Sequence, residues 1–298
     1  MRKRLVRILT VPIIFVLFNL SVHAGHASAQ DNKNFLWKVQ SETGTAYILG
    51  SIHVMKKESY PLNKKIEDAF DRSNSLAVEI NINDIKEKDI PKLMESAIYH
   101  GNDTIEKHIS SETYELLKKE ISVSGIPLEL ISKQKPWLAA LSLMSVKLLK
   151  LGFDPSLGID MHFLSKSSEK KVIELESLES QMDLFSGFSE QEQELFLLYT
   201  LKEMEKIGPY VDRLVRAWKS GDTGDMEMMI LKDLKKDKKL SSVYNKILFT
   251  RNKNMTSKIE GFLKKGGTYF VVVGAAHLIG EKGIIELLWD KGYIVEQM

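Results

Sequence analysis

The strongest constraint on the fold is a run of five apolar residues near the C-terminal end, residues 269–273 (Tyr-Phe-Val-Val-Val). A strand with apolar residues at every position is typical of the centre of a sheet, where both faces are buried. The run leads into residues 274–277 (Gly-Ala-Ala-His), a helical pattern over about 283–290 and a last strand near 293–296. A buried strand that alternates with helix predicts an α/β protein.

The N-terminal end of the chain repeats this layout. Two short strand patterns, residues 35–40 and 45–49, flank a polar connection and predict a β-hairpin. The second strand leads into residues 50–53 (Gly-Ser-Ile-His), a helical pattern over 62–70 and a strand that ends at Glu79. Each end of the chain is therefore a strand–Gly-x-x-His–helix–strand unit.

The middle of the chain is mostly helical. Amphipathic spacing covers residues 84–151 and 189–263, with a brief strand pattern over 171–175 and an N-cap signal at Ser189. We predict a mixed α/β fold in which a central mixed β-sheet, built from the two units, is flanked by helices and carries a long helical middle insertion. No Pro-rich or Ser-rich linker is visible, so we predict one domain over residues 30–298.

The first 29 residues have the three parts of a secretory signal peptide. They carry four basic and no acidic residues, an apolar stretch over 11–20, and Ala-Ser-Ala at 27–29. Cleavage after Ala29 would leave an exported protein, extracellular or periplasmic, with no stable membrane span; an uncleaved anchor is the alternative. The remainder has 42 − 4 = 38 basic and 40 acidic residues, a net charge of −2. That charge gives nucleic-acid binding no support.

The two histidines of these units are candidates for metal binding or catalysis. Ligands of open α/β sheets gather beyond the carboxyl ends of the strands, so His53 and His277 converge there if their strands are adjacent and parallel. The chain has no cysteine, so a metal must be held by His, Asp, Glu or backbone oxygen. Two imidazoles and the carboxylate of Glu79 suit a divalent transition metal, which would activate water at neutral pH. The alternative is that each histidine only satisfies backbone groups at the end of its strand.

Other signals narrow the choice of enzyme class. The chain has no His-Glu-x-x-His, Gly-x-Ser-x-Gly, Walker A or Gly-x-Gly-x-x-Gly motif. These absences weigh against ordinary zincins, α/β-hydrolases and nucleotide-binding enzymes. A third histidine, His162, lies two residues after Asp160 and is a further candidate.

Taken together, these residues resemble the TraB/GumN family, which is related to the TIKI metalloproteases and more distantly to ChaN-like and erythromycin-esterase-like proteins. The resemblance runs from about residue 35 to 298. The matching motifs are residues 50–53, 77–79, 135–137 (Lys-Pro-Trp), 158–160 (Gly-Ile-Asp), 175–177 (Leu-Glu-Ser) with Gln181, 251–252 (Arg-Asn) and 274–278.

The resemblance implies a metal-dependent hydrolase that cleaves peptide or amide bonds, with Mn²⁺, Co²⁺ or Zn²⁺ as the cofactor. By position, His53, Glu79 and His277 are its metal-binding and catalytic residues. Arg251 is a further catalytic residue, which stabilises an oxyanion or holds a substrate carboxylate, and Asn252 also binds substrate.

Three further residues are expected to contact the metal-binding side chains and to orient the imidazoles. They are Asp160, Glu176 and His162. The expected partner is a peptide or small-molecule substrate, with no nucleic acid.

Two other functions are compatible with the same residues. One is a metal-free esterase in which His53, held by Glu79, acts as general base on water. The other is a protein without catalytic activity that binds haem or sequesters a peptide.

Overall fold

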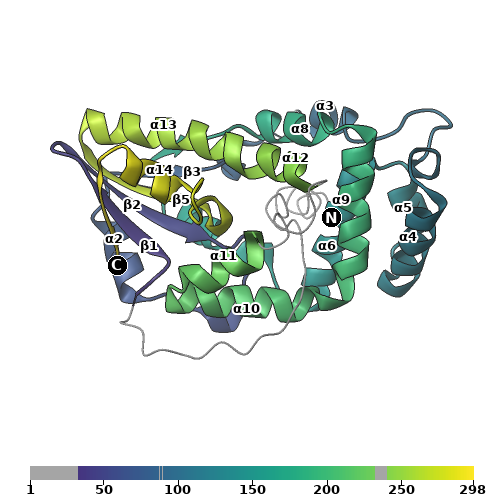
Figure 1. The fold of residues 1–298 in the computed structure, drawn as a ribbon, viewed down its shortest axis with the longest axis horizontal. Coiled ribbons are helices and arrows are strands. Elements are labelled where there is room, and N and C mark those ends of the chain that lie inside the picture. The colour runs from purple at the N-terminus through teal and green to yellow at the C-terminus, as the bar shows by residue number, and fades with distance from the viewer. Residues whose placement is uncertain (1–32, 87, 89, 232–239) are drawn as a thin grey trace. The chain divides into compact units, whose positions relative to one another are not determined.

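The computed structural model describes residues 33–86, 88, 90–231 and 240–298 (Figure 1). The predicted signal peptide, residues 1–29, lies outside the described residues. Within the described ranges, no helix has both the length and the apolar character that crossing a membrane requires.

The described residues form two compact units that interleave along the chain. The sheet unit comprises residues 33–81, 154–177 and 209–298, and the helical unit comprises residues 82–153 and 178–208. The helical unit therefore enters the sequence of the sheet unit as two insertions. The prediction of one domain over residues 30–298 stays a prediction.

The sheet unit is built on six strands in the order β4-β3-β5-β2-β1-β6. Neighbouring strands among β4, β3, β5 and β2 are parallel, whereas β1 pairs antiparallel with both β2 and β6. The strands are β1 (Leu36–Gln40), β2 (Gly44–Ser51), β3 (Ser75–Val78), β4 (Lys171–Glu174), β5 (Gly267–Gly274) and β6 (Ile294–Gln297). The predicted hairpin is thus confirmed, and so is the mixed α/β class.

Strand β5 lies between β3 and β2, as its continuous apolar pattern predicts. Phe270, Val271 and Val273 are completely buried. The register of β2 and β5 places Ser51 opposite Gly274, so the two Gly-x-x-His segments leave the sheet side by side. The strands are adjacent and parallel, so the condition under which the two histidines would converge is met.

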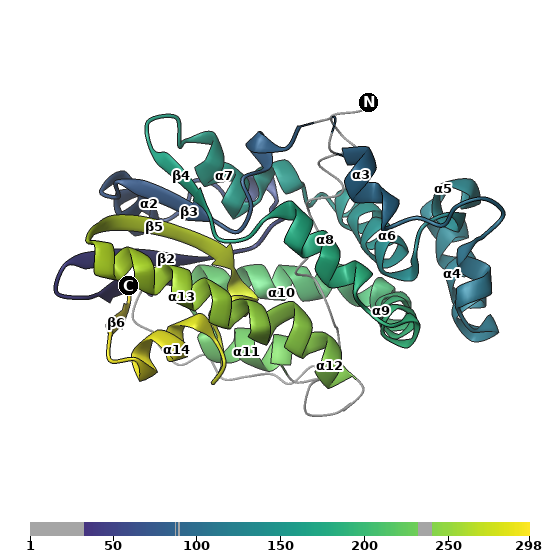
Figure 2. The ribbon, with the colours of Figure 1, turned by 90° about the horizontal axis from the view of Figure 1, so that it is seen from above.

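Helices cover both faces of this sheet (Figure 2). On one face Phe70 and Phe163, from two different helices, contact the ring of Phe270. On the other face Phe262 stacks on Tyr269, the residue before Phe270 in β5. Side chains of successive strand residues point to opposite faces, so the two sets of contacts belong to opposite layers. The helices of this unit are α2 (Lys64–Asp71), α7 (Ile159–Ser165), most of α10 (Ile207–Ser220), α11 (Thr223–Leu231), α12 (Leu240–Tyr244), α13 (Thr250–Lys265) and α14 (Ile284–Asp290).

The helical unit has an aromatic core. Trp137 stacks on Phe185, and Phe188 and Phe196 complete the cluster. Two of its helix ends follow sequence signals: Gly125 ends one helix in the left-handed conformation (φ 66°), and Ser189 begins another with a capping box that includes Glu192. Its helices are α3 (Ile90–Glu95), α4 (Ser111–Ser124), α5 (Leu128–Ser132), α6 (Pro136–Lys150), α8 (Leu178–Ser186) and α9 (Glu190–Glu203).

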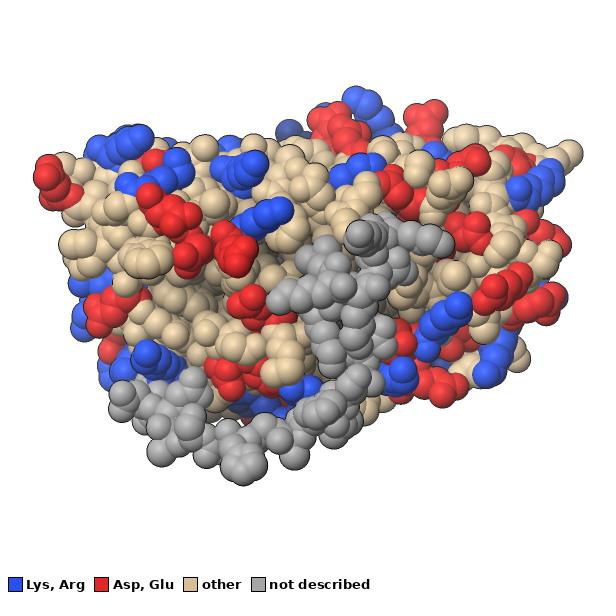
Figure 3. All heavy atoms as spheres, viewed as in Figure 1, with Lys and Arg blue, Asp and Glu red and all other residues tan. Residues whose placement is uncertain are grey.

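On the face drawn in Figure 3, Lys and Arg side chains are interspersed with Asp and Glu side chains. The prediction that the protein does not bind nucleic acid stays a prediction.

Candidate functional site

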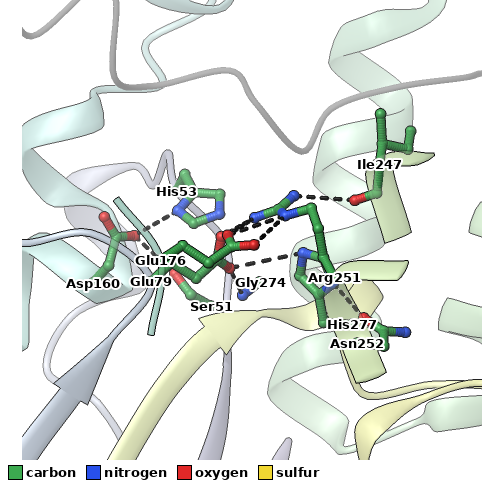
Figure 4. A network of polar contacts seen from close by, with 10 residues as sticks. All are labelled: Ser51, His53, Glu79, Asp160, Glu176, Ile247, Arg251, Asn252, Gly274 and His277. Carbon is green, nitrogen blue, oxygen red and sulfur yellow. Dashed lines mark hydrogen bonds and ion pairs between the residues drawn. The ribbon is translucent and has the colours of Figure 1, made fainter. Parts of the chain in front are cut away.

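The carboxyl ends of the four parallel strands bring the predicted polar residues together in the sheet unit. His53 follows β2, Glu79 follows β3, Glu176 follows β4 and His277 follows β5. Figure 4 shows these side chains gathered around the guanidinium of Arg251, which belongs to α13. This end of a parallel sheet is where open α/β folds bind their ligands.

His53 is held by Asp160, from the first turn of α7. The Nδ1 atom of His53 lies 2.9 Å from Oδ1 of Asp160, and the hydroxyl of Ser51 donates to the same oxygen at 2.8 Å. Gly158 lets this helix approach, because a Cβ there would lie 2.4 Å from the carbonyl oxygen of His53. The loop after β2 and the start of α7 are therefore locked together.

The pair of Asp160 and His53 favours a charged imidazole. Burial lowers the pKa of His53, but the adjacent carboxylate of Asp160 outweighs it, so this pKa is raised above its ordinary value. Burial raises the pKa of Asp160, and the charge of His53 with hydrogen bonds from His53 and Ser51 lowers it overall. Because a carboxylate only accepts, Nδ1 of His53 carries a proton. Its Nε2 atom is buried and has no hydrogen-bond partner among the described residues.

His277 has a different environment. Its side chain is completely inaccessible to solvent, and its Nδ1 atom lies 2.5 Å from Oδ1 of Asn252. Burial, and then the nearby charges of Arg251 and His53, hold the pKa of His277 well below its ordinary value. The Nε2 atom of this second imidazole is likewise buried and has no partner among the described residues.

Arg251 links two carboxylates and a backbone carbonyl. Its Nη2 atom donates to Oε2 of Glu79 at 2.6 Å and to Oε2 of Glu176 at 2.5 Å, while Nε donates to both oxygens of Glu176. Its Nη1 atom donates to the carbonyl of Ile247 at 3.0 Å. The side chain is 6% exposed, so this cluster of charges is buried.

The segment before α13 is a π-helix, Asn245–Phe249, which supplies the carbonyl of Ile247. Such turns are rare and occur often at functional sites. Glu79 is fixed on its other side as well, because its Oε1 atom accepts the backbone N–H of Gly274 at 2.6 Å. The same oxygen lies 3.9 Å from Nε2 of His277.

The donor atoms fit a transition metal in part. Both imidazoles have an Nε2 atom without a partner and an Nδ1 atom anchored by an oxygen, which is the usual arrangement of a metal-binding histidine. The carboxylate of Glu79, in contrast, is bound to Arg251 and Gly274. Among the described residues, no three His, Asp or Glu side chains form a group that could hold a metal ion.

His162 lies in another cluster. Its Nε2 atom contacts Oε1 of Glu67 at 2.8 Å, its ring packs on Tyr60, and Lys166 binds the other oxygen of Glu67. Its contacts among the described residues, with Glu67, Tyr60 and Phe163, do not involve the residues around Arg251. His162 thus ties α7 to α2.

Sequence reasoning did not identify four groups that shape the site. They are the hydroxyl of Ser51, the backbone N–H of Gly274, and the carbonyls of Ile247 and Lys282. Only Ser51 has a signal in the sequence, because it lies inside the first Gly-x-x-His segment. The other three are backbone groups, which every residue type carries.

Comparison with known proteins gives distant relatives of similar length. An uncharacterized protein of Treponema pallidum (strain Nichols) is 21% identical over 295 residues, covering 94% of this chain and 88% of the relative. The uncharacterized protein YbaP of Escherichia coli (strain K12) is 26% identical, covering 81% of this chain and 87% of the relative, and YbaP of Shigella flexneri is similar to the same degree. No solved structure matches the chain. The model of the TraB/PrgY/gumN family matches residues 35–297, and the chain therefore belongs to this family.

Proposed function

We propose that this protein is an exported, metal-dependent hydrolase that cleaves peptide or amide bonds. The observation that carries the proposal is the pair of buried imidazoles, His53 and His277, each with an anchored Nδ1 atom and an Nε2 atom without a partner. A buried polar atom without a partner is costly unless a ligand or a reaction uses it.

The charges around the imidazoles support a divalent cation. Three carboxylates, those of Glu79, Asp160 and Glu176, have side chains that are 24% exposed or less, and the buried guanidinium of Arg251 pairs with two of them, Glu79 and Glu176. With neutral imidazoles these four side chains sum to a charge of −2. A divalent metal bound to the imidazoles would place positive charge beside these carboxylates.

In this proposal the Nε2 atoms of His53 and His277 hold the metal. When bound, the metal would polarise the carbonyl under attack and lower the pKa of the attacking water. Asp160 fixes the ring of His53, and Asn252 fixes the ring of His277. Glu79 remains with Arg251 and borders the site with a negative charge, which would steer the approach of a substrate N–H group.

A metal-free hydrolase is the second candidate, and one observation favours it. His53 is paired with Asp160, and this carboxylate raises its pKa, as in a histidine that takes a proton from water. In that case His277 would accept a hydrogen bond from water or substrate with its free Nε2 atom.

The deciding experiment combines metal analysis with a peptide-cleavage assay. Tag-free protein is assayed by mass spectrometry on a peptide library, with Mn²⁺, Co²⁺ or Zn²⁺ and after treatment with a chelator. We expect cleavage that depends on metal, with bound metal and cleavage both lost in His53→Ala and His277→Ala. The matched control is His162→Ala, which removes an imidazole that contacts Glu67 and should leave both readouts unchanged.

The other outcomes are equally informative. Cleavage that survives the chelator but is lost in Asp160→Asn would favour the metal-free mechanism. Peptides that stay intact under every condition, although the protein binds them, would replace the hydrolase with a sequestering protein. A Soret band on titration with haemin that is lost in His277→Ala would indicate haem binding instead.

A further inference from the structure

We propose that Asn252 is a positioning residue that fixes the tautomer of His277, and that the backbone carbonyl of Lys282 in turn fixes Asn252. Substrate binding by Asn252, which the family resemblance implies, stays a prediction. The proposal rests on the proposed function in one respect, which is that the Nε2 atom of His277 would bind the metal.

The orientation of the Asn252 amide follows from its two contacts. Its Nδ2 atom donates to the carbonyl of Lys282 at 2.8 Å, and its Oδ1 atom faces Nδ1 of His277. A carbonyl only accepts, so exchanging the oxygen and nitrogen of the amide would bring two oxygens together at 2.8 Å. Asn252 is only 1% exposed, so bulk solvent does not reach the amide to stabilise the exchanged orientation.

The tautomer of His277 follows from that orientation. The oxygen of Asn252 accepts, so the proton of the imidazole lies on Nδ1. A proton on Nε2 would have no acceptor among the described residues, because the carboxylate oxygen of Glu79 is 3.9 Å away and lies beyond hydrogen-bond range. Nε2 of His277 therefore presents a lone pair, which is what a metal ion or a donating N–H or O–H group requires.

The loop that carries Lys282 has little freedom to move its carbonyl. Gly280 adopts φ 76°, and a Cβ there would lie 2.7 Å from Cδ1 of Leu231. At Gly283 a Cβ would lie 2.6 Å from the carbonyl oxygen of Ile279. The N–H of Gly283 also donates to the carbonyl of Gly280 at 2.8 Å, which closes the turn. The loop thus presents the carbonyl of Lys282 to Asn252 in a fixed direction.

The two histidines differ in the side chain that contacts Nδ1. Asp160 is a carboxylate and stabilises a charged imidazole, whereas the amide of Asn252 is neutral and cannot take a proton. The two imidazoles are therefore fixed in different ways. A carboxylate orients His53, whereas a neutral amide keeps the proton of His277 on Nδ1 and leaves its Nε2 atom as an acceptor.

The test is a direct measurement of the tautomer. The full chain is labelled with ¹⁵N-histidine and freed of metal with a chelator, and the long-range ¹H–¹⁵N correlations of His277 are assigned by comparison with His277→Gln. We expect a protonated Nδ1 and an unprotonated Nε2. A protonated Nε2 in the wild-type chain would overturn the proposal without any variant.

Variants then test the cause. Asn252→Ala should lose the single tautomer and weaken metal binding by about 10–100-fold, whereas Asn254→Ala, an exposed residue on the same helix, should change neither. An unchanged tautomer in folded Asn252→Ala would refute the role of Asn252. The tautomer is read without metal or substrate, so a failure of the hydrolase hypothesis would be seen separately in the cleavage assay.

Discussion

At the scale of single residues, Arg251 has the most contacts to explain. A planar guanidinium that meets two carboxylates and a carbonyl has few N–H groups left for a substrate. Its charge also balances one of the two carboxylates it touches. These contacts assign Arg251 to holding Glu79 and Glu176 in place, and the expected stabilisation of an oxyanion stays a prediction.

Arg251→Ala should be strongly destabilising. Removing the guanidinium leaves two buried carboxylates facing each other, and breaking a buried ion pair in this way costs about 3–5 kcal/mol. Urea denaturation would measure the loss in the free energy of unfolding. The exposed Arg216→Ala on α10 is the control and should stay within about 0.5 kcal/mol of wild type.

A second variant separates charge from packing. In Arg251→Ala combined with Glu79→Gln and Glu176→Gln, no unpaired carboxylate remains, so most of the lost stability should return. If the single variant were as stable as the Arg216→Ala control, the cluster would not be the buried ion-pair network described above.

At this scale the sequence predicts which side chains converge in the site, but not which groups hold them. His53, Glu79 and His277 follow strands whose apolar patterns are plain, and their convergence needed only adjacent strands. Which acceptor holds which imidazole depends on distances between side chains from α7 and α13. No local pattern encodes those distances, and the carbonyl of Lys282 has no residue-type signal at all.

At the scale of elements, the ends of helices could be predicted from the sequence better than the pairing of distant strands. The capping box at Ser189 and the left-handed Gly125 follow from neighbouring residues, so the sequence predicts them well. The pairing of β6 with β1 brings together two ends of the chain. Although β5 and β6 resemble β2 and β3 in order, β6 joins the opposite edge of the sheet from β4, which a repeated motif alone would not suggest.

The link between α2 and α7 should make stability depend on pH through Glu67. Burial raises the pKa of Glu67, but the hydrogen bonds from Lys166 and His162 lower this pKa by more than burial raises it. The pKa of this carboxyl is therefore depressed in the folded protein. A depressed pKa contributes stability above the unfolded value, about 4.3, and this contribution is lost as the pH falls through the folded pKa.

Urea midpoints of wild type and Glu67→Gln across this acidic range would reveal the effect. The difference in unfolding free energy should be largest near neutral pH and should shrink as the solution becomes more acidic. His162→Gln removes one of the two hydrogen bonds to the carboxylate and should reduce the slope without abolishing it. A difference that does not change with pH would contradict the assignment.

At the scale of the whole molecule, the two ends of the described chain meet. The N–H of Asn34 donates to the carbonyl of Met298 at 2.5 Å, and the N–H of Met298 donates to the carbonyl of Leu36 at 2.9 Å. Both contacts lie beside the β1–β6 edge of the sheet. The sheet unit is therefore nearly a closed path, although the helical unit interrupts its sequence twice.

A circular permutant should therefore fold. Joining Met298 to Lys33 through a short Gly-Ser linker, with new ends between the exposed residues Ser168 and Glu169, leaves every strand intact. We expect cooperative urea unfolding and a near-UV circular dichroism spectrum like that of wild type. A permutant opened inside β5, between Val272 and Val273, cuts a central strand and should not fold. If neither permutant folded, the contacts of Met298 with Asn34 and Leu36 would not describe the protein in solution.

The register that places Ser51 beside Gly274 joins two strands that are far apart in the sequence. A ribosome makes β2 early and β5 almost last, so a growing polypeptide carries His53 and Asp160 long before His277 exists. Parallel pairing over such a separation is slow compared with the formation of local helices. An activity that needs both imidazoles requires the pairing of β2 with β5, so a protein cut short before β5 should have no activity rather than weak activity.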